Sequence, residues 1–204
     1  MTYNEFLDSY SGEIESQDFL TIYESIGKED NTYNSNWDKL IVDLLKLGVN
    51  PLEGLDRIPA YFFSNNTKIK SIKIPETIRS IDIGAFNNSG IEEVIVPDLV
   101  MEVYDWAFNE CNNLKKAILG EGLMSIGNRV FKGCKNLTEV HIKNPDLEEI
   151  GSRLFENCLE LKDIYFNGTL AQWRKIMSIS NDSFNTWNYF KIKVHCKDGI
   201  CGVR

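Results

Sequence analysis

The chain has 204 residues, 43% of them apolar and 25% charged, with a formal net charge of −8. This composition is typical of a soluble globular protein, and no apolar run approaches the roughly 18–20 residues that a membrane-spanning helix needs. The acidic balance argues against direct nucleic-acid binding, because phosphate contacts need clustered Lys and Arg. The first twenty residues lack the basic start and apolar centre of a signal peptide, which predicts a cytoplasmic protein, extracellular only if such a peptide was removed.

Residues 1–54 are predicted to form an acidic, helical N-terminal cap. They hold 11 acidic and 3 basic residues, whereas residues 55–204 hold 19 of each. Apolar residues at i, i+3 and i+4 spacing predict helices at 19–26 and 37–45, joined by a loop at 28–35. The end of a repeat array exposes its core, so we expect these helices to cover it. Their acidic faces either stay in solvent or dock a basic partner.

Residues 55–168 carry an internal repeat. Five phenylalanines recur at intervals of 23, 22, 23 and 24 residues: Phe63, Phe86, Phe108, Phe131 and Phe155. A second column keeps the same intervals: Ile58, Ile81, Val103, Ile126 and Ile150. Two columns with one period predict a solenoid of five stacked coils, in which the phenylalanines fill the interior.

Each repeat ends in a short segment of the form L-x-x-L-x-L, the strand motif of a leucine-rich repeat. Parallel strands are therefore predicted near residues 71–74, 93–96, 116–119, 139–142 and 163–166. The predicted fold class is an α+β repeat: a leucine-rich-repeat solenoid of short parallel strands with a helical N-terminal cap and a small α/β C-terminal cap.

The repeat unit resembles the BspA-like leucine-rich repeats of bacteria. One unit carries the matching residues Ile126, Gly127, Phe131, Cys134, Leu137, Val140 and Ile142. The resemblance implies a non-catalytic binding scaffold without a cofactor or catalytic residue. It also implies a surface or adhesion module as an alternative setting, since many members of that family are exported.

Residues 169–204 are predicted to form the C-terminal cap. Thr169 and Gln172 fit a capping box at the start of a helix. A strand at 189–194 and a turn at 197–199 follow. Trp173 and Trp187 are interpreted as core anchors of this cap.

Five cysteines make an odd number, which fits a reducing compartment. Cys111, Cys134 and Cys158 take the same place in successive coils and are predicted to be buried, reduced and apolar in character. Cys196 and Cys201 flank a turn and would pair only under oxidising conditions. With His195 they also carry the weakest alternative, a zinc-dependent enzyme.

The candidate binding surface is the outward face of the predicted strands. Its central row is Lys73, Ile95, Ile118, His141 and Tyr165, and a charged column beside it is Glu93, Lys116, Glu139 and Asp163. Exposed apolar and aromatic side chains with a polar rim are typical of a protein-interaction site.

These observations predict a non-catalytic protein-binding module whose partner and oligomeric state the sequence leaves open. In its most specific form, the hypothesis is an intracellular inhibitor of a host protein, encoded by a phage or mobile element. The alternatives are the surface module and, last, the metal-dependent enzyme.

Overall fold

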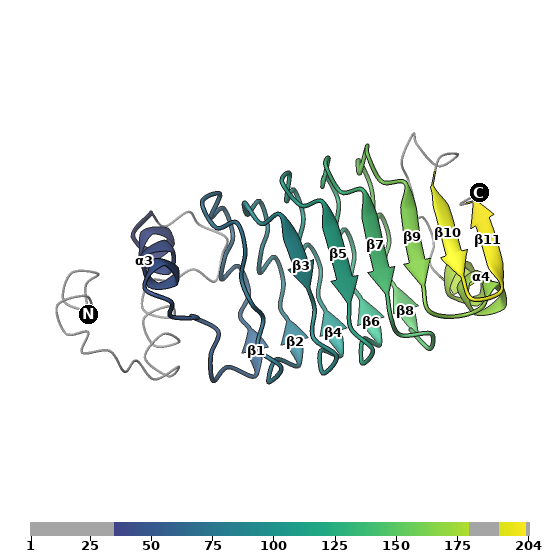
Figure 1. Ribbon diagram of the computed structural model, residues 1–204, viewed down its shortest axis with the longest axis horizontal. Coiled ribbons are helices and arrows are strands. Elements are labelled where there is room, and N and C mark those ends of the chain that lie inside the picture. Colours follow the sequence, from purple (N-terminus) through teal and green to yellow (C-terminus); the bar gives the residue numbers. More distant parts are fainter. Residues whose placement is uncertain (1–34, 180–191, 203–204) are drawn as a thin grey trace.

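The computed structural model describes residues 35–179 and 192–202, which form an elongated solenoid with one helix at each end (Figure 1). The chain climbs and descends once per repeat, so equivalent residues of successive coils lie side by side. The predicted fold class is confirmed.

Helix α3, Ser35–Lys46, covers the first coil. It includes the predicted helix at 37–45 and stops before Gly48, whose φ of 79° is the left-handed conformation of a helix C-terminus. Trp37 anchors it, because its ring meets Phe62 edge-on at 5.0 Å and its Nε1 donates to the Phe62 carbonyl at 2.7 Å. The predicted helix at 19–26 and residues 28–34 of the loop predicted at 28–35 lie outside the described residues, and Ser35 is the first residue of α3 instead of the last of that loop.

One sheet contains the longer strands, in the order β11-β10-β9-β7-β5-β3. Neighbours are parallel except for the β10–β11 hairpin. Four of the five predicted strands are confirmed within this sheet. Its members are β3 (Glu93–Ile95), β5 (Lys116–Leu119), β7 (Glu139–Ile142), β9 (Asp163–Phe166), β10 (Lys193–Cys196) and β11 (Gly199–Gly202).

The predicted strand at 71–74 is wrong, because this segment is not paired with β3. The Glu92 amide donates to the Lys70 carbonyl at 2.9 Å, just before the segment begins. Beyond that bond, Asn50 of the N-terminal cap donates its side-chain amide to the Lys73 carbonyl at 2.7 Å. The first coil is thus held by the cap, and β3 becomes the edge strand of the sheet.

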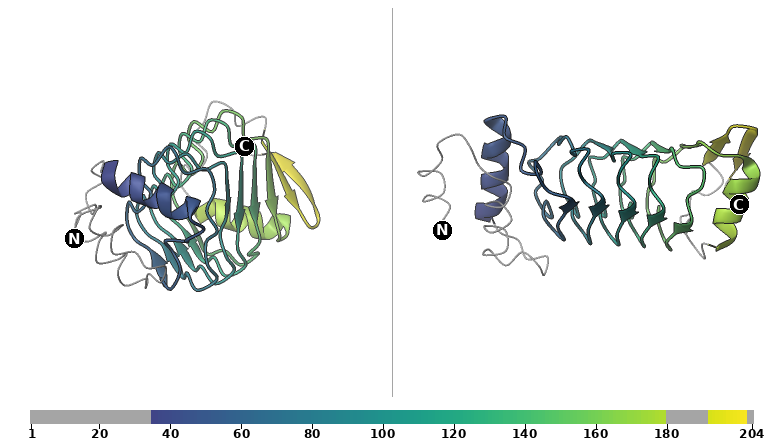
Figure 2. Two further views of the ribbon diagram at one scale, coloured as in Figure 1. Left: turned by 60° about the vertical axis from the view of Figure 1, so that its left-hand side comes forward. Right: turned by 90° about the horizontal axis from the view of Figure 1, so that it is seen from below.

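A second sheet was not predicted from the sequence. It consists of five two-residue parallel strands: β1 (Arg57–Ile58), β2 (Ser80–Ile81), β4 (Glu102–Val103), β6 (Ser125–Ile126) and β8 (Glu149–Ile150). Each strand has one outward residue and one buried residue of the isoleucine column. The two sheets lie on different sides of the solenoid (Figure 2).

The phenylalanine column forms the centre of the core. All five rings are at most 1% exposed, as predicted. They stack with centroid distances of 4.8, 5.1, 5.5 and 5.8 Å along the array. Full burial of each side chain contributes on the order of 2–3 kcal/mol, so this stack is a major source of stability.

The cysteine column is buried as predicted, and its thiols also satisfy backbone groups. Each sulfur donates to the phenylalanine carbonyl of the preceding coil, at 3.0 Å for Cys111, 3.1 Å for Cys134 and 2.9 Å for Cys158. Burial raises the pKa of Cys134 and of Cys158, which keeps both protonated.

Two turns per coil use left-handed backbone. These residues lie two positions before and two positions after each phenylalanine: Tyr61, Asn65, Gly84, Asn88, Trp106, Glu110, Arg129, Gly133, Arg153 and Asn157. Two of the ten are glycine and three are asparagine, which adopt this conformation readily, so closure of the coil imposes it on the other five side chains, which ordinarily avoid it.

Helix α4, Leu170–Ile179, begins with the predicted capping box. The Thr169 amide donates to Gln172 Oε1 at 2.9 Å, and the Gln172 amide donates to Thr169 Oγ1 at 3.2 Å. Trp173 is buried, with its ring 5.4 Å from that of Phe166, which confirms it as a core anchor.

The strand predicted at 189–194 corresponds to β10, which runs over 193–196. Residues 180–191, which include Trp187, lie outside the described residues. Neither described helix has the length and apolar character of a membrane span.

Candidate protein-binding surface

The outward row predicted from the sequence is a continuous feature of the longer-strand sheet. Backbone register places Ile95 beside Ile118, Ile118 beside His141, and His141 beside Tyr165. Ile95 is 55% exposed and Tyr165 is 37% exposed. Lys73 is exposed but lies outside this ladder, because its segment does not pair with β3.

His195 extends the row by one residue that the sequence analysis missed. It pairs with Tyr165 across β9 and β10. The Tyr165 ring lies between two imidazoles, 4.6 Å from His141 and 4.7 Å from His195, with interplanar angles of 19° and 17°. The missed signal was the run Lys193-Val194-His195, which repeats the charged, buried, outward alternation of the preceding strands.

The charged column beside the row is paired within itself and with the histidines. Lys116 Nζ lies 2.5 Å from Glu139 Oε1, and that carboxylate also lies 3.4 Å from His141 Nε2. The hydrogen bond from Lys116 lowers the pKa of Glu139, and the same bond raises the pKa of Lys116. At the C-terminal end, His195 Nε2 lies 2.7 Å from Asp163 Oδ1.

These contacts fix the outward side chains before any partner arrives. Stacked rings and hydrogen-bonded imidazoles have few free rotamers, so little side-chain entropy remains to be lost on binding. Because the rings are stacked face to face, they present their edges to solvent.

A hollow of about 450 Å³ lies at the β3 end of this face. Ile72, Ile74, Ile95 and Pro97 supply its apolar lining, while Lys73, Glu76 and Glu93 contribute charged side chains. The hollow lies between the unpaired segment at 71–74 and the edge strand β3. It brings together Lys73, Glu93 and Ile95, three of the residues singled out in the sequence.

The zinc alternative finds no support in the arrangement of its residues. His195 is stacked on Tyr165 and bonded to Asp163. In the part of the chain that the structure describes, no three His, Cys, Asp or Glu side chains are placed to hold a metal ion. Cys196 and Cys201 are free thiols, and burial raises the pKa of Cys196 to about 11.

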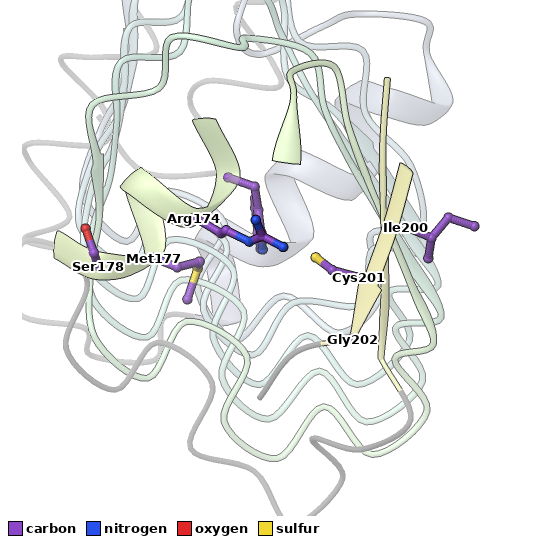
Figure 3. A pocket seen from close by; sticks show the side chains of 7 residues that line it. Arg174, Met177, Ser178, Ile200, Cys201 and Gly202 are labelled. Carbon is purple, nitrogen blue, oxygen red and sulfur yellow. The ribbon is translucent and has the colours of Figure 1, made fainter. Parts of the chain in front are cut away.

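A hollow of about 700 Å³ lies between α4 and β11. Arg174 and Cys201 point into it, whereas Ile200 points away (Figure 3).

The sequence matches the model of a BspA type leucine rich repeat region, in six copies over residues 56–191. The chain belongs to the BspA-type leucine-rich-repeat family. Five coils follow from the phenylalanine spacing, and β10 joins the longer-strand sheet as its fifth parallel strand. Repeat arrays of this BspA type are, in general, non-catalytic modules for protein–protein interaction.

Solved structures of the same architecture come from bacteria. A leucine rich cell surface protein of Faecalibacterium prausnitzii is 29% identical with a TM-score of 0.58, over 61% of this chain and 33% of that one. A leucine-rich repeat protein of Eubacterium ventriosum is 25% identical with a TM-score of 0.52, over 54% of this chain and 30% of that one. The pneumococcal vaccine antigen PcpA, 18% identical with a TM-score of 0.54 over 64% and 38%, shares the fold.

The chain thus spans about a third of the length of each of these three proteins. No protein of curated function matches the sequence.

Proposed function

We propose that this BspA-type module binds a protein partner on the outward face of its longer-strand sheet. One observation carries the proposal: the ordered row Ile95, Ile118, His141, Tyr165 and His195 crosses five neighbouring strands. Apolar and aromatic side chains near the centre of an interface supply most of its binding energy. The tightest contacts are therefore expected at Ile118, His141 and Tyr165.

The charges and the hollow on this face indicate what kind of partner would fit it. The charged column alternates in sign over its first three residues, Glu93, Lys116 and Glu139. Asp163 adds a second negative charge, and Lys193 continues the column with a positive one. A partner with interspersed charges around an apolar centre fits better than one of a single sign. The hollow beside Ile95 has room for one apolar side chain of that partner.

Two cellular settings remain for this function. The F. prausnitzii relative is described as a cell surface protein, which supports a surface or adhesion module. The relatives named above lend no support to a phage-encoded inhibitor of a host protein. Fractionation of the native cells separates the two, because the inhibitor requires the cytoplasmic location expected from the sequence.

Capture of a partner from the native host tests the proposal. The wild type is compared with the double variant Ile118→Asp/Tyr165→Asp, in which two outward side chains of the row become charged. The control is Leu159→Asp, which adds one carboxylate at an exposed apolar residue of a turn in the fifth coil. A partner held by wild type and control and lost by the double variant supports the strand face. A partner retained by the wild type and by both variants contradicts it.

A further inference from the structure

A second exposed apolar surface lies on the side that carries the short strands. We call it the coil-3 band. Four of its side chains come from a single segment of the third coil, and one comes from each neighbouring coil. Its members are Leu99, Met101, Tyr104 and Trp106 with Ile83 and Met124, each between 37% and 47% exposed.

The repeat itself does not require these apolar side chains. The place of Met101 is taken by Arg79 in the second coil and by Glu148 in the fifth. Tyr104 corresponds to Asp82 before it and to Gly127 after it. The band is therefore a local feature of the third coil and its neighbours, and the packing of the solenoid does not account for it.

Trp106 has a left-handed backbone conformation. Its φ is 57°, in the left-handed region that costs a residue with a side chain roughly 1–2 kcal/mol. Gly84 takes the same place in the second coil with a φ of 59° and avoids this cost. Tyr61, Arg129 and Arg153 hold this conformation at the same place in other coils, so closure of the coil accounts for the backbone. Gly84 shows that the coil also closes without a side chain here, so folding does not require the exposed apolar ring of Trp106.

Other contacts hold the band in place. The Tyr104 hydroxyl donates a hydrogen bond to the Glu102 carboxylate, and this bond raises the pKa of the tyrosine. The Met124 amide donates to the Met101 carbonyl at 2.8 Å, which brings the two methionines side by side. Methionine side chains adapt to irregular apolar partners.

The band also borders a hollow. Tyr61, Asn87, Trp106 and Asn109 line a depression of about 280 Å³. The two amides are tied together, since Asn109 Nδ2 donates to Asn87 Oδ1 at 2.7 Å. The surface thus combines projecting apolar side chains with a recess that accepts one.

We propose that the coil-3 band is the contact surface for a second copy of this chain. A two-fold dimer places one patch against itself, so the patch must contain both halves of every contact. This one offers projections and a recess, and it carries both charges. Exposed Arg79 has no ion-pair partner among the described residues, and Glu102 beside Met101 is also exposed.

The size of the coil-3 band also fits a second copy of this chain. Six large side chains, each exposed over more than a third of its area, make a patch near the upper end of the ~300–600 Å² found on typical monomers. Together with its charged rim, it approaches the ~800 Å² per partner that a stable interface buries. The dimer leaves the longer-strand face free, so it presents two copies of the proposed partner-binding surface.

Sedimentation velocity of the purified chain over a wide micromolar range tests this proposal. The wild type is expected to shift with concentration from a mass of 23.4 kDa towards twice that value. Two band variants, Met101→Glu and Trp106→Gly, are expected to weaken self-association at least tenfold. Trp106→Gly is the sharper of the two, because glycine relieves the backbone strain at this position and should preserve the fold or stabilise it.

The control is Ile95→Glu, which adds a charge to the other sheet at a residue that is 55% exposed. It should self-associate as the wild type does, whatever its effect on partner binding. A wild type that stays monomeric throughout the range overturns the proposal. So does a dimer that both band variants leave intact.

Discussion

The side-chain amide of Asn66 donates a hydrogen bond to the backbone carbonyl of Asp38, 3.3 Å away, and so ties the first coil to α3. Asn66 lies three residues after Phe63, the place that Ser89, Cys111, Cys134 and Cys158 take in the later coils. There the cysteine thiols reach the phenylalanine carbonyl of the preceding coil. The first coil has no coil before it, and a longer side chain reaches the cap helix instead.

Replacing Asn66 with cysteine should therefore destabilise the protein, because the thiol is too short to replace the amide at this position. We expect a loss of roughly 1–3 kcal/mol, the cost of leaving buried polar groups unpaired, and faster hydrogen exchange in α3. Ser89→Cys is the matched control, since it installs the same side chain in a coil that has a predecessor. Equal losses in the two variants would argue against a capping role of Asn66.

Phe131→Ala should cost roughly 3–5 kcal/mol, because it opens a cavity in the middle of the ring stack. The Phe131 ring lies 5.5 Å from Phe108 and 5.8 Å from Phe155. Urea unfolding measures the loss, and Phe131→Leu, which fills more of the space, should lose less. A shift of only a few tenths of a kcal/mol in the alanine variant is incompatible with a stack that dominates the core.

Cys134 provides a test of the thiol hydrogen bonds. Cys134→Ala removes the donor to the Phe108 carbonyl at 3.1 Å and should cost roughly 1–3 kcal/mol. Cys134→Ser keeps a donor and should cost less, as Ser89 occupies the same place in the second coil. Equal destabilisation of the two variants would mean that the thiol acts through its volume alone.

The ionised carboxylates of Asp82 and Glu139 should change the free energy of unfolding in opposite directions. Burial raises the pKa of Asp82, although Ser80 and Arg57 partly offset it. Its ionisation therefore costs stability above the folded-state pKa, and Asp82→Asn should stabilise the protein at pH 7. This advantage should vanish as the pH falls below the usual aspartate pKa of about 3.9.

The hydrogen bond from Lys116 lowers the pKa of Glu139, so its carboxylate contributes stability above the usual glutamate pKa. Glu139→Gln should destabilise the protein slightly at pH 7, and the difference should disappear as the pH falls through the lowered folded-state pKa. Urea unfolding of both variants at neutral and acidic pH checks the two signs. Shifts of the same sign at pH 7 would contradict this assignment.

The interior of the solenoid could be predicted because every coil must fill the same space. The phenylalanine, isoleucine and cysteine columns are buried, and their spacing in the sequence equals the spacing of the coils. The left-handed turns could not be predicted in the same way. Five of the ten positions hold residues such as Trp106 and Arg129 that give no signal of that conformation, and only the other five hold asparagine or glycine, which favour it.

The errors at the two ends of the sheet have a different physical origin. Residues 71–74 have the same apolar alternation as the paired strands, but their neighbour on one side is the cap, which bonds the Lys73 carbonyl. His195 belongs to a segment outside the phenylalanine period, so the repeat did not point to it, although β10 continues the sheet. The coil-3 band would have emerged from comparing Met101 and Tyr104 with the charged residues and glycines at their places in other coils.

The affinity of the native partner for the wild type and for Ile118→Asp/Tyr165→Asp, measured by calorimetry, tests the central claim most directly. The account predicts that the double variant folds normally and binds at least a hundredfold more weakly, a change of about 3 kcal/mol or more. Neutralising the acidic residues of the N-terminal cap should change only the association rate and its salt dependence. An affinity that the double variant leaves unchanged, and that collapses when those carboxylates are neutralised, would contradict the account.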